Sequence, residues 1–270
     1  MSTLEKTVQN SPAVETTSRV PGTLRRTWSL TRAELLLLRR NKTLMSIALV
    51  MPISVIGLFS LLEGGVGDGG DATALAIAST VGMLLLFVVY YNVLSTAVAR
   101  REEGVLQRLR TGEAADAEIL VALAAPAVAI TLVQTVVLAA AGAAVLGLPV
   151  PENPLLCLAG VLAGSAVFTG LALITAMFSR TLESVQVTSL PVLGIAVLGA
   201  GMALPLEVLP ERLGDIAQFT PLSPVLDLVG AGWTGSPSGA EVWQAAGVVL
   251  AWIVLSVVVV QRRFRWSPRV

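Results

Sequence analysis

One short segment of this sequence combines charged and apolar residues at a spacing suited to binding another protein. Residues 101–110 read R-E-E-G-V-L-Q-R-L-R. On a helix, one stripe is apolar and its flanks are charged: Val105, Leu106 and Leu109 against Glu102, Arg108 and Arg110. A short amphipathic helix of this kind suits a hydrophobic groove of a partner. A solvated turn between two membrane segments is the alternative that the same residues allow.

Residues for catalysis or metal binding are scarce. The chain has no histidine, which excludes Ser-His-Asp catalysis, histidine-bound metals and haem held by a proximal histidine. Its single cysteine, Cys157, lies in an apolar stretch, and we expect it to pack as a small apolar residue. Neither lysine, Lys6 or Lys42, follows the glycines of a phosphate-binding P-loop. We therefore expect no catalytic residue, metal or cofactor in this chain.

The composition indicates an integral membrane protein. Hydrophobic residues make up 54% of the 270 residues and charged residues only 13%, whereas a soluble domain carries about 25% charged residues. The formal net charge is zero, which argues against a nucleic-acid-binding protein.

Six apolar stretches are each long enough to cross a hydrocarbon core of about 30 Å. They lie near residues 43–62, 73–99, 119–148, 154–179, 184–204 and 240–261. With the N-terminus in the cytoplasm, 17 of the 18 Lys and Arg residues fall on the cytoplasmic side, and only Arg212 falls outside. We therefore expect six transmembrane helices with both termini in the cytoplasm.

The connecting segments divide the rest of the chain. Residues 1–22 read as a mobile cytoplasmic tail, residues 23–264 as the membrane domain, and residues 265–270 as a second tail. Residues 23–40 predict a basic amphipathic helix in the membrane plane, although a juxtamembrane positive flank is the alternative. In the long external connection 205–239, two short apolar segments, 209–219 and 222–228, predict helices that re-enter the membrane.

Small and aromatic residues within the spans have simpler interpretations. Gly160, Gly164 and Gly170 in the fourth span are expected to permit close helix packing. Three tryptophans near the ends of spans are expected to anchor the chain at the membrane–water interface: Trp233, Trp243 and Trp266.

Two motifs make the chain similar to the permeases of ATP-binding cassette (ABC) type-2 transporters. Residues 101–110 resemble the family's cytoplasmic loop, commonly E-R-E-x-G-T-L-x-x-L. The residues Leu190-Pro191, the run P-L-E-V-L-P at 205–210 and the run I-A-Q-F-T-P-L at 216–222 resemble its L-P … P-x-x-x-L-P … I-A-x-x-N-P-L pattern. The resemblance covers residues 23–264.

The resemblance implies an all-α membrane subunit of an exporter that pairs with a second permease, in a homodimer in preference to a heterodimer. Two copies of a separate ATPase subunit would supply hydrolysis, and ATP and Mg²⁺ would bind there. The loop helix would be the coupling helix, and the in-plane helix would also contact the ATPase. The coupling residues implied are Arg101, Glu102, Glu103, Gly104, Leu106, Arg108, Leu109 and Arg110. Gly104 would let the chain turn tightly where the second span ends.

The family's substrate route runs along the dimer interface, mainly at spans two and five. The resemblance therefore implies a path lined by Met83, Phe87, Tyr90, Tyr91, Asn92 and Met202. Aromatic and Met side chains suit a broad apolar ligand. Interfacial anchoring by tyrosine and hydrogen bonding between helices by asparagine remain alternatives.

The function expected is export of a hydrophobic or amphipathic drug or natural product across a bacterial plasma membrane. Antibiotic and drug exporters of this length are common in the family. A modified peptide, a lipid or a polysaccharide precursor is the alternative cargo. A scaffold or sensor subunit that transports nothing is the alternative of a different class.

Overall fold

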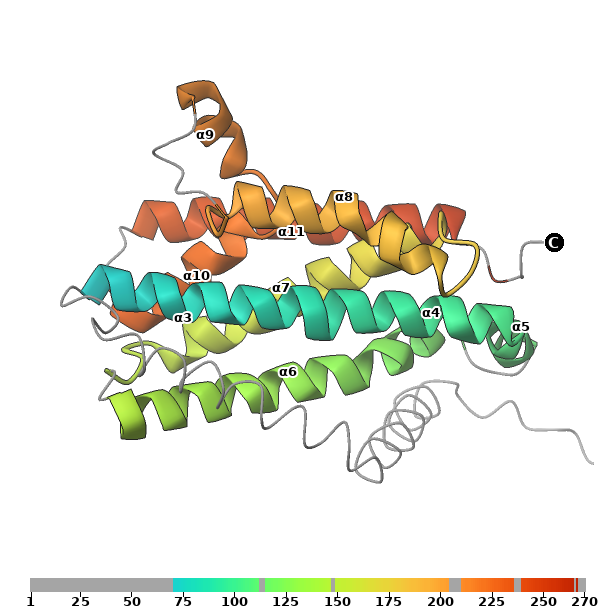
Figure 1. Cartoon of the computed structure of the whole chain (residues 1–270), viewed down its shortest axis with the longest axis horizontal. Coiled ribbons are helices and arrows are strands. Elements are labelled where there is room, and N and C mark those ends of the chain that lie inside the picture. The colour runs from blue at the N-terminus through green and yellow to red at the C-terminus, as the bar shows by residue number, and fades with distance from the viewer. Residues whose placement is uncertain are drawn as a thin grey trace, which may run out of the picture.

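The computed structural model of this chain describes residues 70–111, 115–146, 149–203, 210–235, 239–264 and 266. Throughout these residues the secondary structure is helical (Figure 1), which confirms the all-α class. The tail 1–22, the in-plane helix expected at 23–40 and the span expected at 43–62 lie outside the described residues. The helices are α3 (Gly70–Leu84), η1 (Leu85–Tyr91), α4 (Asn92–Glu102), α5 (Val105–Arg110), α6 (Asp116–Leu146), α7 (Pro154–Ala176), α8 (Ser184–Gly199), α9 (Glu211–Ala217), α10 (Ser223–Thr234) and α11 (Gly239–Arg263).

Four of the described helices are long and apolar enough to cross a membrane: Ile77–Glu102, Asp116–Ala144, Pro154–Ala176 and Gly239–Arg263. They match four of the spans expected from the sequence, with ends shifted by a few residues. The expected span at 184–204 is a shorter apolar helix, because α8 ends at Gly199 and Gly201 follows with a φ of 67°. Its 16 residues measure about 24 Å.

Helix α7 lies at the centre of the bundle and packs against η1, α4, α10 and α11. Asn153 begins it, because its side chain accepts a hydrogen bond from the Leu156 amide at 3.1 Å and Pro154 occupies the first turn. A Cβ on Gly164 would lie 2.6 Å from a Val225 methyl, and one on Gly160 would lie 3.0 Å from a Val229 methyl. The glycines therefore permit close packing, as the sequence predicts.

Helix α10 runs antiparallel to α7 and reaches partway into the bundle. Along it, Val225 contacts Gly164 while Gly232 lies against Cys157, near the start of α7. Gly164 lies ten positions after Pro154, so α10 begins about 15 Å from the level of the start of α7. The apolar segment at 222–228 thus forms a helix, as expected, and this helix is buried and continues to Thr234.

Helix α9 stands away from the bundle (Figure 1), and its apolar residues Leu213 and Ile216 are exposed. Of the three tryptophans expected at the membrane interface, only Trp243 is exposed, with 78% of its surface accessible. The expectation that these side chains face the membrane–water interface is wrong for Trp233 and Trp266, which are 5% and 8% exposed. Trp233 packs with Ile77 and Cys157, whereas Trp266 joins the main core.

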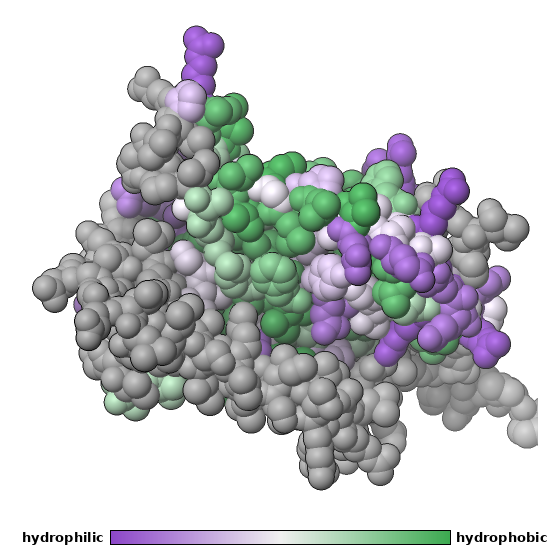
Figure 2. All heavy atoms as spheres, in the orientation of Figure 1, coloured by the Kyte–Doolittle hydropathy of each residue, from purple (hydrophilic) through white to green (hydrophobic). Residues whose placement is uncertain are grey.

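The two ends of the bundle differ in charge. The ends of α4, α7 and α11 and the start of α8 lie together with α5, and hydrophilic side chains gather there, whereas apolar residues cover much of the middle of the visible face (Figures 1 and 2). The described arginines at this end are Arg100, Arg101, Arg108, Arg110, Arg180, Arg262 and Arg263, against the acidic residues Glu102, Glu103, Asp116, Glu118 and Glu183. The described part of the opposite end carries Arg212 with Glu152, Asp215, Asp227 and Glu241.

Candidate coupling site and exposed membrane face

The corner between α4 and α5 depends on Gly104. Its φ of 69° and ψ of 10° lie in the left-handed region, where glycine has no Cβ penalty. The Gly104 amide donates to the Arg101 carbonyl at 3.1 Å, and its carbonyl accepts from the Arg108 amide at 3.2 Å. One residue therefore ends α4 and begins α5, which confirms the tight turn predicted from the sequence.

Helix α5 turns its apolar side inward. Leu106 is fully buried and belongs to the main core, and Leu109 packs partly buried against that core. Gln107, Arg108 and Arg110 are exposed. The apolar stripe thus packs against its own bundle and not into a partner's groove, because α5 folds back onto α4 and α6. The surface that α5 offers to a partner is polar and basic.

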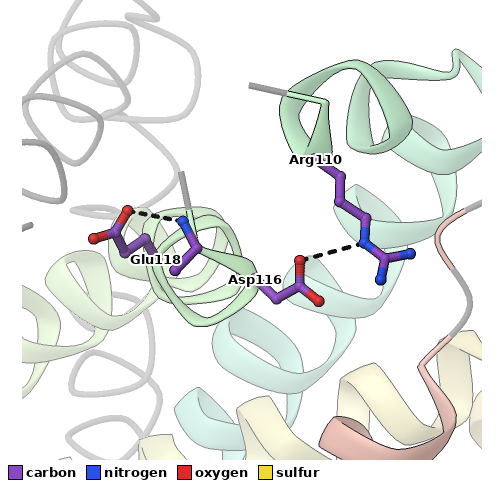
Figure 3. A network of polar contacts seen from close by, with 4 residues as sticks. Arg110, Asp116 and Glu118 are labelled. Carbon is purple, nitrogen blue, oxygen red and sulfur yellow. Dashed lines mark hydrogen bonds and ion pairs between the residues drawn. The ribbon is translucent and has the colours of Figure 1, made fainter. Parts of the chain in front are cut away.

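The end of α5 is fixed to the start of α6 (Figure 3). Arg110 Nε lies 3.4 Å from Asp116 Oδ1, with both side chains about half exposed. The Arg110 guanidinium also lies 5.4 Å from the ring centre of Trp266, at cation–π distance. Glu118 accepts a hydrogen bond from the Ala115 amide at 3.1 Å, which caps the first turn of α6.

Two neighbouring residues at the end of α4 differ sharply in environment. Arg101 is 3% exposed and donates hydrogen bonds to the carbonyls of Ala176 and Ser179, which lie at and just beyond the end of α7. Glu102 is exposed, and its Oε2 accepts from the Leu182 amide at 3.2 Å. Glu103 is exposed. Of the expected coupling residues, Arg101 and Leu106 therefore face the interior, while Glu102, Glu103, Arg108 and Arg110 face outward.

The expected path residues fall into two groups. Met83 and Phe87 are 41% and 52% exposed, Asn92 is exposed and Tyr91 is half-buried. Half-buried Met202 lies beside Gly82, with its sulfur 3.4 Å from where a Cβ on that glycine would be. Met83, Phe87, Tyr91 and Asn92 thus lie on or near the outward surface of the α3–η1–α4 helix, whereas Met202 packs partly buried against the core.

Tyr90 is the exception, because it is fully buried against α7. Its hydroxyl donates to Thr175 Oγ1 at 3.2 Å, and its ring meets Phe168 edge-on with centroids 6.4 Å apart. Tyr90 and Tyr91 both belong to the π-helical segment η1. Such segments are rare and often occur at functional sites. The sequence offered no signal for this π-helix or for the partners of Tyr90, which are 78 and 85 residues away in the chain.

Within the described residues, no group of three or more histidine, cysteine, aspartate or glutamate residues lies close enough to hold a metal ion. The thiol of Cys157 is buried and contacts the Val229 carbonyl at 3.5 Å. This contact belongs to the packing of α10 on α7.

The long apolar helices define a multi-pass helical membrane protein. The sequence profile described as ABC-2 type transporter matches residues 25–232. The chain therefore belongs to the ABC-2 type transporter family and is its membrane permease domain, a transport subunit without a catalytic domain. Permeases of this family generally pair with an ATPase subunit. A comparison with curated proteins finds no match.

Proposed function

We propose that this permease carries a hydrophobic or amphipathic drug or natural product out of the cell, driven by ATP hydrolysis in a separate subunit. The observation that carries the proposal is the outward face of α3–η1–α4. Met83, Phe87 and Asn92 are exposed there, with Tyr91 beside them. Met and aromatic side chains adapt to varied apolar ligands, and one amide provides a hydrogen-bonding group.

The proposal places this face and α8 against a second copy of the chain, so that the path runs between the two copies. The exposure of α8 supports this, because Val187, Leu190 and Ile195 are 69%, 61% and 58% exposed. Short α8 and the residues near 43–62 then complete six spans. Lipid surrounds the remaining apolar surface.

We also propose an orientation for the chain in the membrane. The α5 end and both termini lie in the cytoplasm of a bacterial cell, and the α9–α10 end lies outside. The concentration of arginines at the α5 end supports this, because cytoplasmic flanks of membrane spans are enriched in Lys and Arg. Two ATPase copies, which bind ATP and Mg²⁺, then contact the exposed polar side of α5.

The first experiment purifies the chain in mild detergent from its own membrane and identifies the proteins that accompany it. A stoichiometric partner with a phosphate-binding P-loop is expected. If the chain is intact and abundant without such a partner, the proposal fails in favour of a scaffold or an ATP-independent carrier.

The second experiment reconstitutes that complex in vesicles and measures ATP-dependent movement of a fluorescent lipophilic cation. The double variant Met83→Ala, Phe87→Ala is compared with Leu250→Ala, Val254→Ala on α11, which removes equally spaced exposed apolar side chains. We expect at least about a tenfold loss for the first pair, equal to about 1.4 kcal/mol, and little change for the second. Equal effects of the two pairs contradict the path. Transport of a peptide or lipid with no transport of the cation indicates a different cargo.

A further inference from the structure

Arg101 links two parts of the chain that are far apart in sequence. It lies in the last turn of α4, and its Nη1 donates to the Ala176 carbonyl at 2.6 Å, 75 residues away. Its Nη2 donates to the Ser179 carbonyl. With 3% of its surface exposed, the guanidinium is enclosed by the ends of α4 and α7.

The chemistry of this contact suits arginine. The last carbonyls of a helix lack partners within the helix and carry the negative end of its dipole. The planar guanidinium presents several N–H groups in a fixed fork, so it reaches two carbonyls at once. A lysine ammonium carries the same charge but lacks the fork. Arg101 therefore caps the end of α7 from a different helix.

A second contact holds the same turn from the other side. Glu102 accepts a hydrogen bond from the Leu182 amide, in the connection between α7 and α8. Within this connection, Ser179 Oγ lies 2.6 Å from Thr188 Oγ1, which fixes the turn to the first part of α8. Arg101 and Glu102 thus both bind the connection between α7 and α8, and this connection is itself hydrogen-bonded to α8.

Beyond Arg101 and Glu102, the chain continues from α4 into α5. Gly104 joins the two helices in a tight turn, and buried Leu106 holds α5 against the core. Arg101 therefore lies within one helical turn of the corner from which α5 begins.

We propose that Arg101 is a positioning residue that locks the α4–α5 corner to the α7–α8 turn, so that α5, the end of α7 and the start of α8 move as one body. The part of this inference that concerns ATP-driven motion rests on the proposed function. The lock itself does not, because its contacts lie within one chain.

The first test uses the full chain alone in lipid nanodiscs, in a Cys157→Ser background. Spin labels at Thr111→Cys and Glu183→Cys, both exposed, report the separation of α5 from the α7–α8 turn by electron paramagnetic resonance. With Arg101 present we expect a narrow distance distribution. Arg101→Gln is expected to widen it at least about twofold, and Arg101→Lys is expected to give an intermediate width. Arg180→Gln is the matched control, because that arginine lies in the same turn with an exposed side chain, and it is expected to leave the distribution unchanged.

The second test adds the ATPase partner and traps the complex with Mg²⁺, ATP and vanadate. We expect the distance between 111 and 183 to stay constant while a reference pair, Thr111→Cys and Gln261→Cys on α11, changes. In Arg101→Gln both distances are expected to change, and cation-stimulated ATPase activity is expected to fall about tenfold with the partner still bound. That combination separates a positioning role from a merely stabilising one.

Two results would overturn the inference. One is a wild-type distance distribution between 111 and 183 in Arg101→Gln. The other is an equal change of both label pairs in the trapped wild-type complex. If Arg101→Gln does not fold, Arg101→Lys combined with Glu102→Ala tests the same lock without removing the buried charge. If no ATPase partner binds, the proposed function fails, but the width measured in the chain alone still decides whether the lock exists.

Discussion

Helices α7 and α8 follow each other in the chain and are both apolar, yet the molecule packs around one and leaves the other on its surface. Buried residues occur along the whole of α7, from Cys157 to Ala176. On α8 the buried residues are Val185, Ser189, Ala196 and Gly199, and large apolar side chains between them are exposed. Among the described helices, α8 packs mainly against α4, α7 and α9.

The difference shows that hydrophobicity does not measure packing in a membrane protein. Lipid tails are as apolar as a protein core, so an apolar face needs no protein partner to avoid water. Helix α7 differs because it has small residues at the positions where other helices approach it closely. Bulky residues such as Phe168 fill the space between α7 and its neighbours at other positions. On α8 the one close approach at a described glycine is at its last residue, Gly199, against Thr220, whereas a Cβ on Gly194 in the middle of the helix would meet nothing within 4 Å.

The largest expected difference comes from deleting a large side chain. Phe168→Ala on α7 removes a fully buried ring that contacts Tyr90, and a cavity of that size costs about 3–5 kcal/mol. Ile195→Ala on α8 removes an exposed side chain and is expected to change stability little. Thermal unfolding in detergent measures both, and equal losses would break the comparison between the two helices.

A smaller effect is expected from adding atoms. Gly164→Val places a side chain where a Cβ already lies 2.7 Å from Leu85 Cδ1 and closer to Val225, and overpacking costs about 1–3 kcal/mol. Gly194→Val on α8 is the matched control, and we expect it to unfold at nearly the wild-type temperature. The yield of monodisperse protein on size-exclusion chromatography should follow the same order. A tolerated valine at Gly164 would show that α10 moves aside easily.

The next effect concerns one hydrogen bond. Tyr90→Phe keeps the ring against Phe168 but removes the donor to Thr175, for an expected loss of about 1 kcal/mol. Thr175→Val tests the other partner, and the double variant should lose less than the sum of the two single losses if the bond joins them. Additive losses would show that the two hydroxyl groups act independently.

The smallest effect on stability is expected from a substitution on the exposed side of α8. At this site we therefore measure contact between two copies of the chain instead of stability. In a Cys157→Ser background, Leu190→Cys should fold with nearly unchanged stability, because this side chain is 61% exposed. If α8 faces a second copy, oxidation gives a crosslinked dimer in the native membrane. Leu250→Cys on α11, also 61% exposed, is the control expected to crosslink less. Equal crosslinking of both would place α8 against lipid.

Sequence features that depend on near neighbours were predicted well. Four of the six apolar stretches became long helices, Gly104 became the tight turn, and the glycines of α7 became contact points. Each follows from local rules: the length needed to cross a membrane, the freedom of glycine at positive φ, and the small size of glycine.

Predictions that required knowing which side of a helix faces inward succeeded less well. Leu106 and Leu109 were expected to face a partner but contact the core, and Trp266 was expected at the interface but is buried beside Arg110. Tyr90 and Tyr91 are adjacent in sequence, yet only Tyr90 is fully buried. On α5 the apolar stripe did mark the inward side of the helix, but that side meets the chain's own core and not a partner. Within the membrane spans, amphipathic periodicity loses its meaning because both surroundings are apolar.

The sequence by itself determined the membrane class, the helical segments, the gathering of arginines between particular spans and the membership of the ABC-2 type transporter family, because each depends on composition, length or a contiguous motif. Only the tertiary structure decided that Arg101 caps α7, that α10 enters beside α7 and that α8 stays exposed. The capping of α7 and the position of α10 depend on contacts between residues 61 to 80 positions apart. Helix packing fixes such contacts, and no local pattern encodes them.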